Sequence, residues 1–224
     1  METGSCSICG DIKKLTNDHL PPKNIFTKPY PKNLITIKSC FECNNGASTS
    51  DEAFKIMLAL ILGGNGDDMR TQPLFDSALK SIKHNRRIGR NLKKHIRNTY
   101  LTSQAGIIIE KGFLVKIDAE VVNQFEEVIK RITKGLYSYH YGHFIGKNTS
   151  FIIRLHNQLT PEILDLINIF KINRIGTGHF SYGYTCGSED LTRVSLWLYE
   201  FYQKYWVSCS TRTISENILE NIAI

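Results

Sequence analysis

Two pairs of cysteines near the N-terminus place the strongest constraint on how this chain can fold. Each pair has the spacing Cys-x-x-Cys, and thirty residues, positions 10–39, separate the pairs. Four thiolates in two such pairs are a common way to build a tetrahedral zinc site. A redox dithiol is the alternative, but the segment lacks the βαβ pattern that accompanies such motifs. We therefore predict a structural zinc ion held by Cys6, Cys9, Cys40 and Cys43.

The composition is that of a folded protein rather than a disordered one. Hydrophobic residues make up 42% and charged residues 22% of the 224 positions, which is enough for a normal packed core. We find no apolar run of the roughly 18 residues that a membrane span needs. The first residues also lack the pattern of a signal peptide. We expect a cytoplasmic protein without a membrane partner.

Hydrophobic periodicity predicts an α+β protein in which an N-terminal zinc module precedes a mixed helical and antiparallel-sheet region. The predicted parts are a module over 1–62, a joint with a basic helix over 63–104, and a region of unknown role over 105–224. Predicted helices cover about 48–62, 73–97, 118–139 and 160–170. Predicted strands cover 33–38, 150–156 and three segments of the aromatic tail after 178, and a hairpin covers 106–117, turning at 110–112.

Positive charge is concentrated in one stretch of the chain. The net charge is +7, yet residues 77–109 contain eight Lys or Arg and no Asp or Glu. On a helix over 73–97 these cations would share one face, which suits contacts with phosphates but is also common on solvated helices. The residues expected to contact nucleic acid are Lys83, Arg86, Arg87, Arg90, Lys94 and Arg97.

An Asp-His pair lies between the two cysteine pairs, and an Asn follows the last cysteine. A zinc ion would tie these segments to one scaffold, so Asp18, His19 and Asn44 can converge. Carboxylate and amide oxygens suit Mg²⁺ or Mn²⁺, and a neutral His can take a proton from water. A divalent ion and a general base are the requirements of phosphodiester hydrolysis.

These residues, in "CSIC", "NDHLPPK" and "NLITIKSCFECNN", resemble the HNH or ββα-metal endonucleases. The match is to the subgroup with two zinc knuckles, similar to phage resolving enzymes of the endonuclease VII type. It covers about residues 6–54. The rest of the chain resembles only uncharacterised bacterial proteins with this motif.

The resemblance implies a fold, an activity and a set of roles. His19 would be the general base, and Asp18 and Asn44 would bind the catalytic Mg²⁺ or Mn²⁺. Asn33 would be the central Asn that shapes the loop around the base. The third signature residue is Asn44 rather than His, which makes the motif an H-N-N variant. The implied activity is hydrolysis of nucleic acid, with DNA favoured over RNA.

Other interpretations of the same residues stay open. His19 can be a lone surface histidine, and the zinc module can bind nucleic acid without cleaving it. The chain can also be an effector of a bacterial defence or toxin system that acts only with a partner protein. A homodimer is a further option for its assembly.

Overall fold

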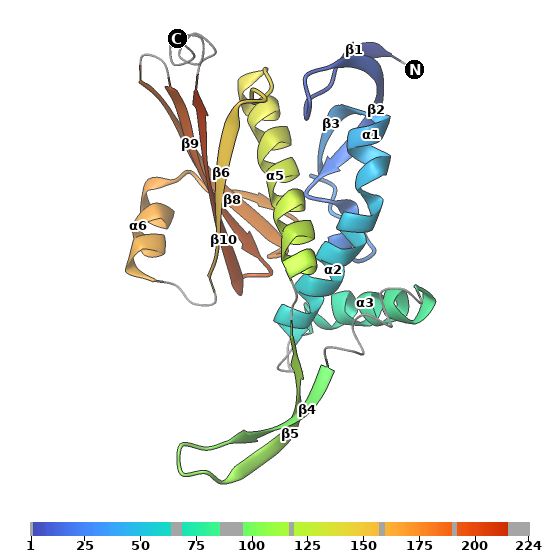
Figure 1. Ribbon diagram of the computed structural model, residues 1–224, viewed down its shortest axis with the longest axis vertical. Coiled ribbons are helices and arrows are strands. Elements are labelled where there is room, and N and C mark those ends of the chain that lie inside the picture. The colour runs from blue at the N-terminus through green and yellow to red at the C-terminus, as the bar shows by residue number, and fades with distance from the viewer. Residues whose placement is uncertain are drawn as a thin grey trace, which may run out of the picture.

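A long helix, α5 (Ala119–Tyr141), lies between the N-terminal part of the chain and a C-terminal β-sheet (Figure 1). The protein is mixed α+β with antiparallel sheets, as predicted. No helix among the described residues is long and apolar enough to cross a membrane. The computed structural model describes residues 2–63, 69–85, 96–116, 119–156, 160–189 and 192–214.

The N-terminal part is a small sheet followed by a helix. Its strands are β1 (Thr3–Ser5), β2 (Ile12–Leu20) and β3 (Ile35–Cys40), in that order, with a 3₁₀ turn η1 (Lys23–Ile25) between the last two. β1 pairs only with residues 12–14 of β2, whereas β3 pairs with residues 15–20. The chain then continues through α1 (Phe41–Asn44) and η2 (Asn45–Ala47) into α2 (Ser48–Gly63), close to the predicted helix.

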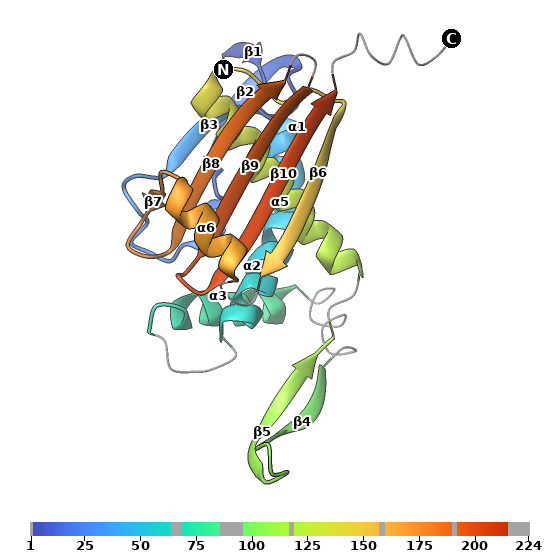
Figure 2. The same cartoon turned by 90° about the vertical axis from the view of Figure 1, so that its left-hand side faces the viewer.

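The C-terminal sheet has five antiparallel strands in the order β6-β10-β9-β8-β7. Helix α6 (Pro161–Ile169) crosses its outer face, and α5 covers the inner face (Figure 2). The predicted strand at 150–156, the helix at 160–170 and the three tail strands are all present. The strands are β6 (Thr149–His156), β7 (Asn173–Ile175), β8 (Phe180–Glu189), β9 (Thr192–Phe201) and β10 (Tyr205–Ile214).

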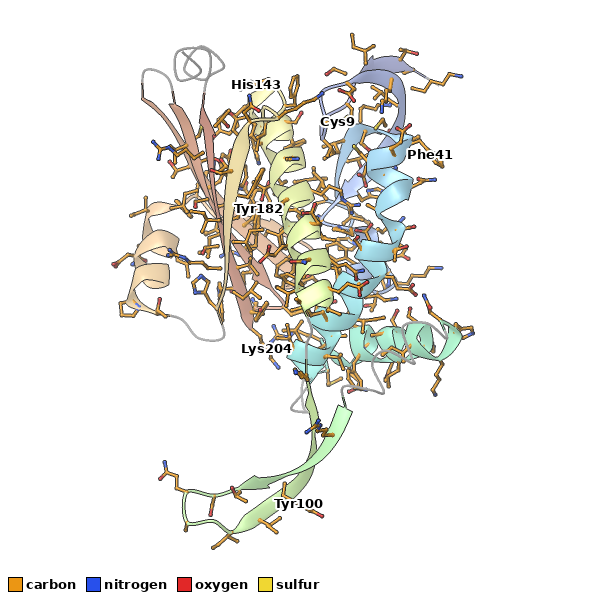
Figure 3. The ribbon with its side chains drawn as sticks, viewed as in Figure 1. Cys9, Phe41, Tyr100, His143, Tyr182 and Lys204 are labelled. Carbon is orange, nitrogen blue, oxygen red and sulfur yellow. The ribbon has the colours of Figure 1, made fainter. Side chains whose placement is uncertain are left out.

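The core is continuous from the N-terminal strands to the last strand of the large sheet. α5 buries apolar side chains on both sides, and its Thr133 Oγ1 lies 2.7 Å from Tyr199 Oη of β9. Phe54 of α2 contacts Phe125 of α5 and Phe201 of β9, with ring centroids 4.6 and 5.6 Å apart. Tyr182 lies in the same layer between α5 and the sheet (Figure 3). The two halves of the chain therefore share one hydrophobic interior.

The predicted basic helix over 73–97 is confirmed in its first part and wrong at its end, and residues 86–95 lie outside the described part of the chain. Helix α3 (Gln72–His84) ends at Asn85, and residues 96–102 form a strand, β4 (Ile96–Thr102), paired with β5 (Ile108–Val115). Ile, Thr and Tyr in β4 favour strand. The turn predicted at 110–112 is wrong too, because these residues pair within β5 and the chain turns at 103–107. The two strands form a ribbon that projects from the body (Figures 1 and 2), with Tyr100 exposed (Figure 3).

Gly135 lets α5 approach the β2–β3 hairpin, and its replacement by Ala should destabilise the protein. A Cβ at this position would lie 2.4 Å from Leu20 Cδ1 and 3.0 Å from Ile37 Cδ1, and both side chains are buried. Overpacking of this kind costs about 1–3 kcal/mol. Ala gains about 1 kcal/mol over Gly in helix propensity. We expect net destabilisation in urea unfolding of Gly135→Ala.

Gly46→Ala is the matched control, because a Cβ at Gly46 would have no neighbour within 4 Å. It should leave the free energy of unfolding nearly unchanged. Equal stability of the two variants would show that α5 does not depend on close contact at Gly135.

Candidate metal centre and adjoining site

The four paired cysteines come together at one end of the N-terminal sheet. Cys6 and Cys9 lie in the turn between β1 and β2, Cys40 ends β3, and Cys43 belongs to α1. Their sulfur atoms all lie within 4.8 Å of one another, and Cys9 Sγ is 4.0 Å from Cys40 Sγ. Sulfurs around a tetrahedral zinc ion are roughly 3.8 Å apart. The cluster has the size and chemistry to hold a metal ion such as zinc.

The backbone around Cys6 favours its charged form. The N–H groups of Ile8 and Cys40 donate to Cys6 Sγ at 3.4 and 3.2 Å. Burial raises the pKa of this thiol, but backbone hydrogen bonds from Cys9, Cys40 and Ile8 outweigh burial and lower the pKa overall. Burial raises the pKa of Cys40 to about 11 and also raises the pKa of Cys43. Metal binding would displace these protons, because thiolates are the ligands.

Asp18 and Asn44 lie on the same face of the β2–β3 hairpin. Asp18 is only 6% exposed and accepts a hydrogen bond from Ser39 Oγ at 3.3 Å. Asn44 Nδ2 donates to Thr16 Oγ1 and to the Asn17 carbonyl oxygen, both at 3.0 Å. Thr16 and Asp18 are two residues apart on β2, so their side chains point to the same face. Since both N–H groups of the Asn44 amide are used, Oδ1 is the atom it can offer to a cation.

His19 projects from the opposite face of the hairpin, because neighbouring residues of a strand alternate. Its Nδ1 lies 3.1 Å from the hydroxyl of Thr36, its cross-strand partner on β3. The structure therefore brings Asp18 and Asn44 to one face and His19 to the other. Residues 16–20 of β2 pair with β3 on one side, so a ligand crossing the other edge could contact both faces.

The Asn33 side chain contacts the C-terminal sheet. Its Nδ2 donates to the Arg174 carbonyl oxygen at 2.9 Å, and its Oδ1 accepts from the Gly176 amide at 3.1 Å. These bonds hold the loop before β3 against β7. The amide that was predicted to shape the loop around the base is thus engaged with another element.

Arg131 is a residue of this region that the sequence did not reveal. It comes from α5, its side chain is 7% exposed, and its Nη2 lies 2.5 Å from Asp51 Oδ1 of α2. Burial raises the pKa of Asp18, and the positive charge of Arg131 counteracts part of that rise. Burial also raises the pKa of Asp51. The one indication of its role in the sequence is that Arg131 stands among the apolar positions of the predicted helix 118–139.

The residues predicted to bind nucleic acid do not form one helical face. Lys83 lies near the end of α3, and Arg97 lies on β4. Both are exposed. The others, Arg86, Arg87, Arg90 and Lys94, are outside the described residues.

Comparisons with protein-family models, curated proteins and solved structures found no match to this chain. The functional interpretation therefore depends on the residues and their geometry.

We expect the purified protein to contain one tightly bound transition-metal ion per chain, because four close thiolates bind such ions strongly. Removing the ion with a chelator should lower the melting temperature, since metal binding contributes folding free energy. Metal analysis and thermal unfolding measure both effects. Cys40→Ser should lose the metal, while Cys209→Ser, a buried thiol of β10 outside the cluster, should keep it. A metal-free wild-type protein of unchanged stability would contradict the metal centre.

Arg131→Met should destabilise the protein by about 3 kcal/mol, because it leaves the partly buried carboxylate of Asp51 without its counter-charge. Adding Asp51→Asn should recover part of that loss. Urea unfolding of the wild type, both single variants and the double variant gives the coupling energy. A coupling energy near zero would mean that the ion pair does not hold α5 to α2.

Proposed function

We propose that this chain is a metal-dependent HNH-type endonuclease that hydrolyses phosphodiester bonds in nucleic acid. The observation that carries the proposal is the position of Asp18 and Asn44 on one face of a hairpin, beside a cluster of four cysteines. His19 follows Asp18 in the same strand, and a helix follows the hairpin. This order of hairpin, ligand residues and helix agrees with the motif that the sequence resembles.

In this proposal the cysteine cluster holds a structural zinc ion. Four sulfur ligands complete a tetrahedral site and leave no position for water or substrate. The zinc would therefore tie residues 6–9 to residues 40–43 and take no part in the reaction. Asn44 follows Cys43 directly, so the zinc would also fix the backbone of a residue at the catalytic site.

His19 is the proposed general base. In the tautomer in which Nδ1–H donates to Thr36 Oγ1, the Nε2 atom carries the free electron pair. That atom can accept a proton from a water molecule, and the hydroxide formed can attack phosphorus in line with the leaving 3′ oxygen. Thr36 acts by holding the ring in one orientation. The products would carry a 5′-phosphate and a 3′-hydroxyl.

Asp18 and Asn44 are the proposed ligands of a catalytic Mg²⁺ or Mn²⁺. Their donor atoms, a carboxylate oxygen and an amide oxygen, are of the type these ions prefer. When bound, such an ion would neutralise charge on the phosphate oxygens and on the leaving oxygen. The substrate that we favour is DNA, on the strength of the resemblance.

A nucleic-acid-binding module without catalysis is the second candidate. It is favoured by Arg131, whose positive charge already acts on Asp18 on the face where the divalent ion would bind. In that case the cysteine cluster would only shape a surface that binds nucleic acid, and no catalytic ion would be needed. Stable binding of nucleic acid, with no cleavage in Mg²⁺ or Mn²⁺, would select this candidate.

His19→Ala should abolish cleavage while leaving the metal content of the cysteine cluster unchanged, because it removes the proton acceptor alone. General bases contribute about 10²–10⁴-fold in rate. The assay uses plasmid, linear DNA, branched DNA and RNA, each with Mg²⁺ or Mn²⁺, and follows cleavage on gels.

His156→Ala is the matched control, since His156 of β6 is also half-buried and its ring lies 2.9 Å from the Ser208 hydroxyl. It should cleave at the wild-type rate. Equal activity of His19→Ala and wild type would remove His19 from the mechanism.

A further inference from the structure

The β4–β5 ribbon projects from the body of the protein, at the end where α2 and α3 lie (Figures 1 and 2). Figure 3 places its Tyr100 at the end of the molecule opposite Cys9. Tyr100 is 58% exposed. A two-stranded ribbon that stands alone is only marginally stable in water, so a partner that received it would stabilise it. The ribbon therefore has the form of an arm that binds a partner.

Exposed cations lie at the root of the ribbon, the end that joins the body. Arg97 is the second residue of β4, Lys116 directly follows β5, and both are exposed. Lys80 and Lys83 are exposed on α3, at the same end of the body. Within the described part of the chain, none of these four side chains forms an ion pair. They are therefore available to an anionic partner.

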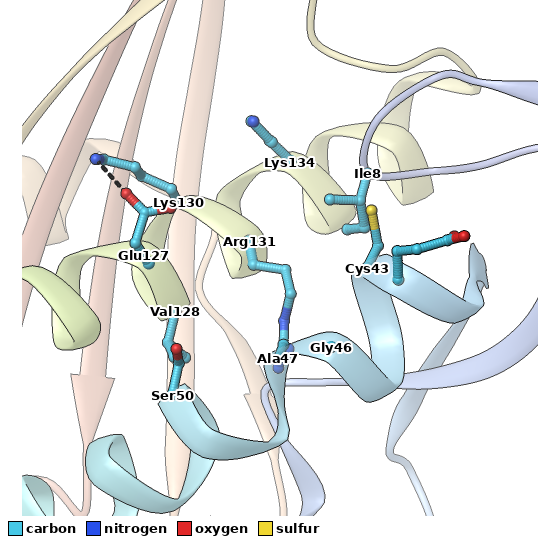
Figure 4. A pocket seen from close by; sticks show the side chains of 11 residues that line it. Ile8, Cys43, Gly46, Ala47, Ser50, Glu127, Val128, Lys130, Arg131 and Lys134 are labelled. Carbon is cyan, nitrogen blue, oxygen red and sulfur yellow. Dashed lines mark hydrogen bonds and ion pairs between the residues drawn. The ribbon is translucent and has the colours of Figure 1, made fainter.

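The basic side chains of the pocket beside the cysteine cluster differ, because they are engaged within the protein (Figure 4). Lys130 pairs with Glu127 at 2.8 Å, and Arg131 pairs with Asp51. The Lys134 amine lies 5.5 Å from the centroid of an aromatic ring of β6. The root of the ribbon is thus the better place for contacts with phosphates.

The sequence around the ribbon is complementary to a polyanion. Residues 77–109 contain eight Lys or Arg and no Asp or Glu, and residues 96–116 carry three cations against one carboxylate, a net charge of +2. A second copy of the ribbon would bring the same positive charge, whereas nucleic acid brings phosphates. Two-stranded ribbons also have the width to enter a groove of duplex DNA. Shape and charge thus favour a nucleic-acid duplex over a second copy of this chain.

The tip of the ribbon presents apolar side chains on a closed turn. The Ser103 N–H donates to the Ile107 carbonyl oxygen at 2.8 Å, and the Gly106 N–H donates to the Ser103 carbonyl oxygen at 2.9 Å. Gly106 has a φ of 79°, a conformation that glycine adopts readily. Ile107 and Ile108 are 68% and 62% exposed. Exposed apolar side chains of this kind insert between base steps in proteins that bend DNA.

We propose that the β4–β5 ribbon is an arm that enters a groove of duplex DNA. Arg97 and Lys116 contact phosphates at its root, and Ile107 and Ile108 contact base steps at its tip. The choice of DNA rests on the proposed function, whereas groove entry follows from the shape and charge of the ribbon.

The test is fluorescence anisotropy of a labelled DNA duplex with the full-length protein, without added Mg²⁺ or Mn²⁺ so that cleavage does not remove the duplex. The wild type should bind saturably. Arg97→Gln with Lys116→Gln should weaken binding at least fivefold and lower the slope of log affinity against log salt by about two, because two phosphate contacts are lost. Arg154→Gln with Lys171→Gln is the matched control, since both are exposed cations outside the ribbon, and it should bind like the wild type.

A second pair of substitutions tests the tip. Ile107→Ser with Ile108→Ser should weaken binding at least fivefold at an unchanged salt slope, because no phosphate contact is lost. A 2-aminopurine base in the duplex should brighten when the wild type unstacks it and should stay dark with this variant. Ile152→Ser with Ile169→Ser is the matched control, since these isoleucines outside the ribbon are 56% and 73% exposed, and it should behave like the wild type.

Duplex binding that neither ribbon variant weakens would overturn the proposal, as would binding of single-stranded DNA as tightly as duplex. Sedimentation tests the other occupant: if the tip variant converts a dimer into a monomer, the ribbon binds a second copy and the proposal fails. Cleavage is measured separately in Mg²⁺ or Mn²⁺. A duplex that is bound through the ribbon but not cleaved would overturn only the proposed function, and cleavage with binding that does not depend on the ribbon would overturn only the arm.

Discussion

The contact among four cysteine sulfurs is the constraint on which the N-terminal part depends. It joins the turn after β1 to the end of β3 and to α1, so it closes a loop of thirty intervening residues. Those residues include four prolines, and the buried apolar side chains among them are Leu15, Leu20, Ile25, Phe26 and Ile37. Closing such a loop costs conformational entropy, which a bound metal can offset. The hairpin carrying Asp18 and His19 is positioned by that closure.

Helix α5 connects this small hairpin to the rest of the protein. On one side Gly135 allows Leu20 and Ile37 to approach, and on another Thr133 meets Tyr199 of the large sheet. Arg131 lies on the same helix and pairs with Asp51. The helix thus fills the space between the layers and adds charge to the N-terminal site. A module of this kind is incomplete without the helix that covers it.

The sequence predicted well the features that depend on local pattern. Cysteine spacing located the four-sulfur cluster, and apolar periodicity located α2, α5, α6 and the tail strands. The helix predicted over 73–97 is wrong at its C-terminal end, because charge was weighed more heavily than the β-branched residues of β4. At the site, the positions of Asp18 and Asn44 relative to the cysteine pairs predicted that both residues lie near the cysteine cluster. It could not show that strand alternation separates His19 from Asp18, since register is a tertiary property.

Two hydrogen bonds connect residues far apart in the chain. The Gly176 amide donates to Asn33, and the Tyr202 hydroxyl donates to the carbonyl oxygen of Ile25. The second spans 177 positions. Contacts so distant along the chain form late, because the intervening polymer must first be ordered. During synthesis the first fifty residues emerge from the ribosome long before β9 exists. The N-terminal sheet therefore acquires these neighbours only after β7 and β9 have been made.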